Sequence, residues 1–247
     1  MNLIEDLPLF PRRIYAIGDI HGCPQELAVL LNHLKSIECI SPADLIIFLG
    51  DYIDRGQNPK QVIEILLKIQ LEFPNTIFLK GNHEDMLLNF LGFPGMAGKF
   101  YLQNGGITTL SSYGLAHTYI ASEVLENFPK DHLQFIQTLR YGVSIGDYLF
   151  VHAGVNPSRH IDNQRGEDLM WIRDEFMINS HNVGKTVVFG HTPLHEVVCD
   201  EPQRIGLDTG LVFGNKLSCM EIFSKKLFQV KRGGESVLVG IAEQLPS

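Results

Sequence analysis

The chain has 247 residues, of which 45% are hydrophobic, and its formal net charge is −8. This length allows one large domain or two small ones, and the apolar fraction is ordinary for a globular protein. The acidic balance argues against a broad nucleic-acid-binding surface, because such surfaces usually carry an excess of lysine and arginine. It does not argue against a phosphate substrate, since bound divalent cations can reverse the charge of a site locally.

Neither a membrane span nor a signal peptide is predicted. The sequence has no run of 18 apolar residues, and Glu5 and Asp6 stand where a signal peptide would be basic and then apolar. We therefore expect a soluble, cytoplasmic protein without a membrane partner. The cysteines are too few and too irregularly spaced for a disulfide scaffold. We expect free thiols at all four positions, Cys23, Cys39, Cys199 and Cys219.

The first part of the chain alternates strands and helices. Three apolar runs have the pattern of buried strands, at 13–17, 45–49 and 76–79. Apolar residues at helical spacing predict three helices, at 24–35, 59–71 and 83–91. Two of these helices begin with a proline, which suits the first helical turn. This order predicts an α/β architecture whose strands are buried on both faces.

The second part of the chain is rich in predicted strands. Glycines interrupt any long element between residues 92 and 130, and we interpret this segment as a cap insertion beside a cleft. A short helix is predicted at 130–140, and it is followed by strands at 148–151, 186–189, 204–207, 217–223 and 227–231. No repeat or linker divides the chain. We therefore expect a single domain over residues 1–247, with a loose tail from about residue 233.

Five predicted strands end in a side chain that can bind a metal. At each junction a small residue or a valine precedes an aspartate, an asparagine or a histidine. The junctions are GDIHG at Asp19 and His21, GDYIDRG at Asp51, GNHE at Asn82, HAG at His152 and GHT at His191. In open α/β sheets the carboxyl ends of the strands line the ligand crevice, so we expect these side chains to meet. The glycines allow the backbone to turn sharply and to pack closely there.

Each motif taken alone has an ordinary explanation. An aspartate after a strand, such as Asp19, is most often a helix N-cap or a turn residue. A histidine within an apolar run, such as His152, is most often part of the core. The ordered set, in contrast, favours a metal site. Carboxylate, imidazole and amide ligands without thiolate suit manganese, iron or zinc, and six of them fit two ions that share a carboxylate.

The complete set resembles the phosphoprotein phosphatase family of metallophosphoesterases, particularly its bacterial and phage-type serine/threonine phosphatase branch. The five motifs, together with WIRDEF and LDTG, carry the similarity from Tyr15 to about Phe223. The resemblance implies a calcineurin-like fold, in which a central mixed β-sandwich is flanked by α-helices and carries a dinuclear centre at its edge. By motif position, the first metal would be bound by Asp19 and His21, the second by Asn82, His152 and His191, and both by a bridging Asp51.

The resemblance also assigns catalytic roles. His83 would be the general acid for the leaving oxygen, and Asp54 would hold its imidazolium in place and keep its pKa raised. Arg55 would bind the phosphoryl oxygens through its planar guanidinium. Arg173 resembles a second phosphate-binding arginine, although an exposed helix arginine beside a packed tryptophan is the alternative. Asp208 is either a partner of a ligand histidine or a turn residue.

The predicted reaction is hydrolysis of phosphoserine or phosphothreonine in a phosphoprotein or phosphopeptide. A hydroxide bridging two divalent ions, with manganese preferred to iron or zinc, would attack phosphorus in line, and His83 would protonate the departing alkoxide. The closest alternative is a symmetrical dinucleoside tetraphosphate hydrolase on the same scaffold. The DRG sequence at 54–56 and Glu84 favour the protein phosphatase. A non-catalytic binding module is disfavoured, because every expected ligand and His83 are present.

Overall fold

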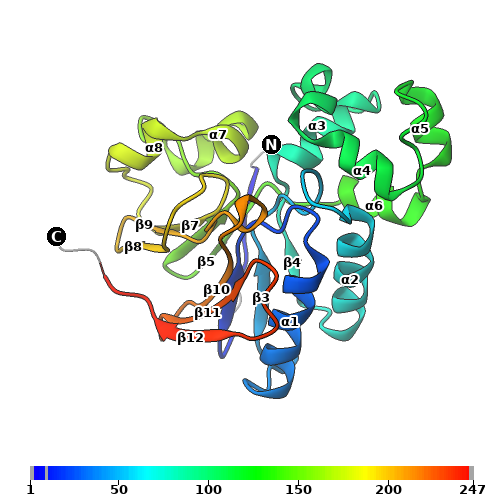
Figure 1. Ribbon diagram of the computed structural model, residues 1–247. Helices are drawn as coiled ribbons and strands as arrows, with labels where there is room; N and C mark the ends of the chain where they lie inside the picture. The colour runs from blue at the N-terminus through cyan, green and yellow to red at the C-terminus, as the bar shows by residue number, and fades with distance from the viewer. Residues whose placement is uncertain (1–2, 9–10, 245–247) are drawn as a thin grey trace.

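The computed structural model describes residues 3–8 and 11–244, which form two six-stranded sheets (Figure 1). The first sheet has the order β1 (Ile4–Asp6), β5 (Gly142–Ile145), β6 (Tyr148–Val151), β7 (Thr186–Phe189), β9 (Arg204–Gly206) and β8 (Val198–Asp200). The second has the order β12 (Leu238–Ile241), β11 (Lys226–Lys231), β10 (Lys216–Glu221), β2 (Ile14–Ile17), β3 (Leu45–Phe48) and β4 (Ile77–Phe78). Both sheets mix parallel and antiparallel pairs, so the predicted mixed α/β fold is confirmed.

Helices flank the outer faces of both sheets (Figure 1). The second sheet is accompanied by α1 (Pro24–Ser36) and α2 (Pro59–Glu72), and the first by α7 (Gly166–Trp171) and α8 (Asp174–Ile178). A separate helical group stands above α2, made of α3 (Asn82–Phe90), α4 (Gly106–Ser112), α5 (Ala121–Asn127), α6 (Lys130–Gln137) and the 3-10 turns η1 (Gly98–Phe100) and η2 (Leu102–Asn104). No helix within residues 3–8 and 11–244 is long and apolar enough to cross a membrane.

Strand β2 illustrates how the core is divided. Successive side chains of a strand point to opposite faces of its sheet. Accordingly, Ile14 and Ala16 belong to the apolar cluster between the two sheets, which also contains Val143 of β5. Tyr15 and Ile17 instead belong to the cluster that includes α1 and α2. All four side chains of β2 are at most 1% exposed, as predicted for a strand buried on both faces.

The sheet register aligns the carboxyl ends of the strands. Parallel pairing places Ile17 beside Phe48 and Phe48 beside Phe78, so β2, β3 and β4 end together. In the first sheet β6 and β7 are also parallel, with Phe150 paired to Val188. The segments that follow these five strand ends carry the predicted metal ligands. The fold therefore brings five distant parts of the sequence to one edge of the sandwich.

Some elements were not predicted. These elements are short, so their apolar residues are too few to show a periodic pattern; they are β1, β5, β8, α7 and α8. The predicted insertion at 92–130 contains α4 and α5, although its glycines suggested no long element. Residues 238–241, within the predicted loose tail, form β12. Every side chain of β12 is exposed, so backbone pairing with β11 defines this strand rather than an apolar pattern.

Candidate metal centre and active site

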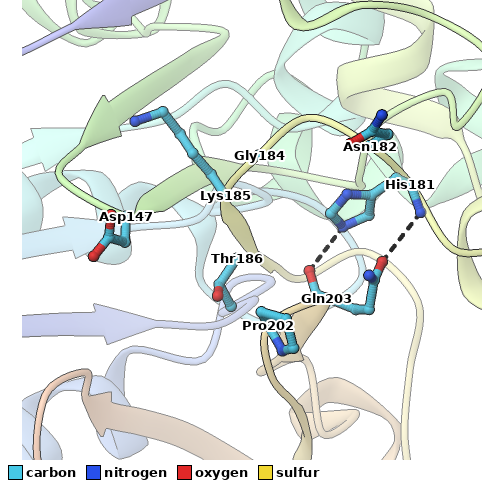
Figure 2. A pocket seen from close by; sticks show the side chains of 8 residues that line it. All are labelled: Asp147, His181, Asn182, Gly184, Lys185, Thr186, Pro202 and Gln203. Carbon is cyan, nitrogen blue, oxygen red and sulfur yellow. Dashed lines mark hydrogen bonds between the residues drawn. The ribbon is translucent and has the colours of Figure 1, made fainter.

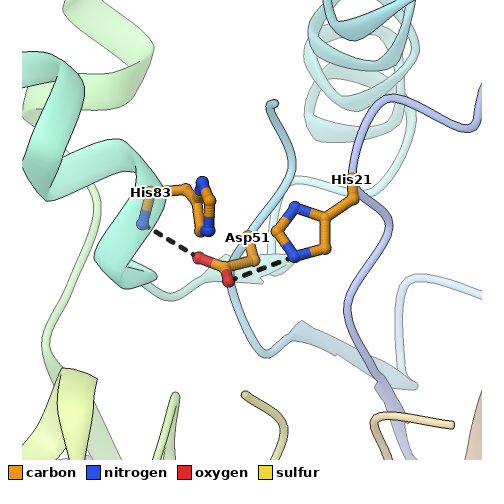
Figure 3. A group of neighbouring side chains, drawn as sticks. All are labelled: His21, Asp51 and His83. Carbon is orange, nitrogen blue, oxygen red and sulfur yellow. Dashed lines mark hydrogen bonds and ion pairs between the residues drawn. The ribbon is translucent and has the colours of Figure 1, made fainter. Parts of the chain in front are cut away.

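Potential ligand atoms gather in two groups, within each of which they lie less than 4.8 Å apart. One group is His21, Asp51 and His83, and the other is Asp51, His152 and His191. Figure 3 shows the Asp51 carboxylate between His21 and His83 in the first group. Asp51 belongs to both groups, which is the position that a bridging carboxylate requires. The first group contains His83, which the sequence assigned to catalysis, in place of Asp19.

Two of the histidines present the same ring nitrogen to Asp51. His21 Nε2 and His152 Nε2 each lie 3.4 Å from a different oxygen of this carboxylate. Their Nδ1 atoms lie 2.8 Å from the carbonyl oxygens of Ile53 and Leu49, respectively. Because a carbonyl can only accept a hydrogen bond, Nδ1 carries the proton in both rings. In the neutral form of each ring the lone pair is therefore on Nε2, and in His21 that atom also lies 3.0 Å from Arg55 Nη1.

The other predicted ligands join the same buried site. Asn82 Oδ1 lies 3.1 Å from His152 Nε2. Both carboxylate oxygens of Asp19 accept the backbone N–H of His191, at 3.2 and 3.1 Å. The six predicted ligands are each at most 4% exposed. The structure thus brings all six residues together. Asp19 belongs to neither three-residue group and joins the site through its hydrogen bonds to the backbone of His191.

Glycines make this close packing possible. A Cβ atom on Gly81 would lie 2.0 Å from Asp51 Oδ1, and one on Gly190 would lie 2.1 Å from Asp19 Oδ1. Any other residue at these positions would displace a carboxylate. The ligand loops are also strained, because His21, Asp51 and His191 have φ angles of 42°, 52° and 63°. Such conformations are uncommon for residues other than glycine and often mark functional sites.

Glu84 joins two of the ligand loops. Its buried carboxylate accepts the backbone N–H groups of Asp51 at 3.0 Å, Tyr52 at 2.8 Å, Ile53 at 3.2 Å and Gly81 at 3.0 Å. The segment after β3 is thereby fastened to the segment after β4. Sequence reasoning used Glu84 only to distinguish two enzyme branches. Its place as the third residue of α3, where a glutamate can bond back to the N-cap, was the available signal.

Burial determines the charge of two predicted ligand histidines. It lowers the pKa of His21 to about 3 and the pKa of His191 to about 2. Both rings are therefore neutral near pH 7, which is the form that binds a metal. Burial also lowers the pKa of His152, but the negative charge of Asp51 outweighs it and raises that pKa to about 9.

The buried carboxylates respond differently to their surroundings. Burial, reinforced by the negative charge of Asp208, raises the pKa of Asp19 well above its ordinary value. Burial would raise the pKa of Asp51 as well, but the charges of His152 and His83 outweigh it and hold that pKa well below its ordinary value. A dense group of buried acids of this kind is stabilised by positive charge.

The residues present fit divalent metal ions. His191 Nε2 is buried and has no hydrogen-bond partner among the described residues. A buried polar atom without a partner is costly, and a ligand that accepts its lone pair removes that cost. Carboxylate, imidazole and amide donors, without sulfur, are the set expected for manganese, iron or zinc.

His83 and Asp54 form the predicted pair. His83 Nδ1 lies 2.6 Å from Asp54 Oδ2, and both residues are 0% exposed. Burial lowers the pKa of His83, but Asp51 and Asp54 outweigh it, so the net shift is upward. His83 Nε2 has no partner among the described residues, and its ring packs edge-on against that of His21, with 4.7 Å between centroids. A protonated Nε2 would therefore be placed beside the ligand group.

The two predicted phosphate-binding arginines differ in their surroundings. Arg55 is half-buried, and its Nη1 lies 3.0 Å from Nε2 of His21. Its guanidinium also lies over the exposed ring of Phe213, 5.4 Å from the centroid. Arg173 is exposed at the start of α8, and its charge adds to the effects of burial and His152 in lowering the pKa of His191. Arg173 is thus near the site, and its role in binding phosphate stays a prediction.

Asp208 is a turn residue. Its Oδ1 accepts the backbone N–H of Gly210 at 2.9 Å, and its backbone carbonyl accepts the N–H of Leu194. It is also 5% exposed and, as described above, raises the pKa of Asp19. Of the two interpretations left open by the sequence, the structure therefore shows the turn contact directly.

A cavity of about 460 Å³ lies away from this site, where β6 and β7 begin (Figure 2). His181 forms part of its wall and is held by Gln203, whose side chain accepts the backbone N–H of His181 and whose carbonyl oxygen lies 2.7 Å from the ring Nε2. The metal-competent residues lie beyond the opposite ends of these strands. The cavity contains none of the predicted site residues in its lining.

Comparisons with known proteins identify a family and several relatives of this chain. The model of the calcineurin-like phosphoesterase family matches residues 12–224. Serine/threonine-protein phosphatase 2 of Salmonella typhimurium is 29% identical over 221 residues, which cover 85% of this chain and 93% of that protein. An asymmetrical bis(5′-nucleosyl)-tetraphosphatase of Oceanobacillus iheyensis is 29% identical over 238 residues, with coverage of 88% and 92%.

The fold is shared with solved structures at lower identity. A candidate diadenosine tetraphosphatase of known structure superposes with a TM-score of 0.69 at 22% identity, over 92% of this chain and 97% of the other. The segment matched by the family model contains all ten residues that the sequence assigned to metal binding or catalysis. The chain therefore belongs to the calcineurin-like phosphoesterases.

Proposed function

We propose that this protein is a metal-dependent phosphomonoesterase that removes phosphate from phosphoserine and phosphothreonine in proteins. The observation that carries the proposal is the hydrogen bond between His83 and Asp54 directly beside a buried group of metal-competent side chains. This arrangement would place a proton donor beside bound cations, which would act as the electrophile. The similarity to a bacterial serine/threonine-protein phosphatase supports the substrate class.

Two divalent ions, which we propose to be manganese, would be held by Asp19, His21, Asp51, Asn82, His152 and His191. When bound, they would neutralise charge on the phosphate and activate water for attack on phosphorus. The chain itself contributes the orientation of these ligands. The hydrogen bonds from Nδ1 of His21 and His152 to backbone carbonyls fix both rings, so each Nε2 faces Asp51.

Arg55 would orient the substrate. Its guanidinium lies at the edge of the ligand group and can donate two parallel hydrogen bonds to phosphoryl oxygens. Arg173, whose charge contributes to lowering the pKa of His191, would add a second positive charge. Neither arginine replaces a metal ligand in this proposal. Loss of Arg55 would therefore affect the reaction of the substrate and leave the metal content of the protein unchanged.

His83 would supply the proton that the leaving group needs. Because its Nδ1 is bonded to Asp54, the imidazolium form carries its second proton on Nε2, on the side of the ligand group. The serine alkoxide is a poor leaving group, so protonation in the transition state accelerates its departure. The negative charge of Asp54 keeps the imidazolium favoured, in agreement with the raised pKa of His83.

A substrate panel tests the proposal. The manganese-loaded protein should release phosphate from phosphoserine and phosphothreonine peptides with a higher kcat/KM than it shows for dinucleoside tetraphosphates. The similarity to a bis(5′-nucleosyl)-tetraphosphatase makes the second substrate the relevant competitor. Nucleotide products separated by chromatography would show whether such cleavage is symmetrical or asymmetrical. A clear preference for the dinucleotide would replace the protein phosphatase proposal.

A further inference from the structure

The insertion is attached directly to the loop that carries two predicted catalytic residues. The carbonyl oxygen of Gly105 accepts the backbone N–H of Arg55 at 3.3 Å, just before α4 begins. A Cβ atom on Gly105 would lie 2.8 Å from Arg55 Cγ, so the contact is close. At the other end of α4, the hydroxyl of Ser112 accepts the backbone N–H of Lys60 at 3.2 Å. Helix α4 is therefore held to the catalytic loop at its start and to the first turn of α2 at its end.

The loop needs such support because its backbone is strained. Asp54 and Arg55 have φ angles of 67° and 64°, so two consecutive residues other than glycine occupy the left-handed region. Conformations of this kind persist only where the surrounding structure fixes them. The hydrogen bond from Arg55 to Gly105 fixes one of the two residues. Another contact must fix Asp54.

Thr109 of α4 holds Asp54 through two hydrogen bonds, both made by its hydroxyl oxygen. Its Oγ1 accepts the backbone N–H of Asp54 at 3.0 Å and donates to Asp54 Oδ1 at 2.5 Å. A hydroxyl has one proton and two lone pairs, so it can satisfy both bonds at once. Thr109 and Asp54 are each 0% exposed, so bulk solvent does not reach these hydrogen bonds. Thr109 thus fixes both the backbone and the carboxylate of Asp54.

The second oxygen of the same carboxylate holds His83. Asp54 Oδ2 lies 2.6 Å from His83 Nδ1, while Oδ1 is bonded to Thr109. Rotation of the carboxylate would break one of these two bonds. The orientation of the His83 ring is therefore linked, through Asp54, to a side chain of the insertion that lies 55 residues from Asp54 in the sequence.

We propose that Thr109 is a positioning residue that acts through Asp54 to aim His83 at the leaving oxygen of the substrate. This inference rests on the proposed function, in which His83 is the general acid. It gives the segment 92–130 a part in the chemistry. The loss of the Thr109 hydroxyl should weaken proton transfer, and it should not remove metal or prevent substrate binding.

The test uses matched variants of the full chain loaded with manganese. Thr109→Val removes the hydroxyl and keeps the branched shape, whereas Thr109→Ser keeps the hydroxyl. Thr109→Ala replaces the valine variant if valine prevents folding. Ser111→Ala, on an exposed position of the same helix, is the control. The measurements are metal content, melting temperature, and kcat for a phosphoserine peptide and for nitrophenyl phosphate, which has a good leaving group.

Thr109→Val should lower kcat for the peptide by about 10- to 100-fold, as is typical when an orienting partner is lost, and kcat for nitrophenyl phosphate by less than about 3-fold. Thr109→Ser should restore most of the peptide activity, and Ser111→Ala should match the wild type. In a His83→Asn background, Thr109→Val should cause no further loss on the peptide, because the group through which it acts is gone.

Several results would overturn the inference. These are equal losses on both esters, a loss of metal in Thr109→Val, or a further loss in the His83→Asn background. If His83→Asn shows the selective loss on the peptide and Thr109→Val does not, only the positioning role of Thr109 fails. If the manganese-loaded wild type hydrolyses neither ester, the proposed function fails and the inference fails with it.

Discussion

Glu84→Gln should destabilise the protein by a large fraction of its total stability. In the wild type, Oε1 accepts the N–H groups of Tyr52 and Ile53, and Oε2 accepts those of Asp51 and Gly81. Glutamine has one carbonyl oxygen, so its amide NH₂ would face two of these donors. Two buried donors without acceptors cost about 2–6 kcal/mol in total, at about 1–3 kcal/mol each. Domains have only about 5–15 kcal/mol of stability.

Urea denaturation followed by circular dichroism measures this loss. A chelator in all samples keeps metal binding out of the comparison. Glu123→Gln is the matched control, because Glu123 is exposed on α5 and its replacement should change the free energy of unfolding by less than about 0.5 kcal/mol. A free energy of unfolding for Glu84→Gln within about 0.5 kcal/mol of the wild type would refute the reasoning, since the four hydrogen bonds would then be dispensable.

Three other outcomes are expected. Arg55→Ala should lower kcat/KM by at least about 10-fold with unchanged metal content, and Arg55→Lys should not restore it fully, because an ammonium cannot make two parallel bonds; full rescue by lysine would argue against paired contacts. His83→Asn should lower kcat for hydrolysis of a phosphoserine peptide by about 10²–10⁴-fold, and kcat for nitrophenyl phosphate much less. An equal loss of kcat across esters of graded leaving-group pKa would show that His83 is not the general acid. Burial would raise the pKa of Asp44, but hydrogen bonds from Arg13 and Arg12 outweigh burial and hold that pKa below its ordinary value. The contribution of Asp44 to stability is therefore present at neutral pH and is lost as the pH falls below about 4. Asp44→Asn should therefore lower the melting temperature at pH 7 and flatten its dependence on pH between about 5 and 2; an unchanged pH profile would contradict this assignment.

The elements that carry the site could be predicted from the sequence. The continuous apolar runs of β2 and β3 identify strands buried on both faces, and the carboxyl ends of such strands meet at one edge. Asp19 and Asp51 could therefore be placed together before any contact was known. Short elements such as β8 and β12 could not be predicted, because pairing with a neighbouring strand defines them rather than a periodic pattern.

Most supporting contacts of the site were also beyond the sequence. Glu84 bonds to backbone groups 31 to 33 residues away, and Thr109 bonds to Asp54 across 55 residues. No local spacing links these positions, since the packing of α3 and α4 against the loop after β3 creates the contacts. The motifs thus indicated which groups perform the chemistry, whereas the fold was needed to show what holds them.

The central claim is that the buried side chains around Asp51 hold two divalent cations that hydrolysis requires. The most direct measurement is elemental analysis of the chain after dialysis against manganese, paired with phosphate release from a phosphoserine peptide. We predict two ions per chain in the wild type, no activity after treatment with a chelator, and loss of both ions in Asp51→Asn. Full activity of the metal-free protein, or two ions per chain in Asp51→Asn, would contradict the account.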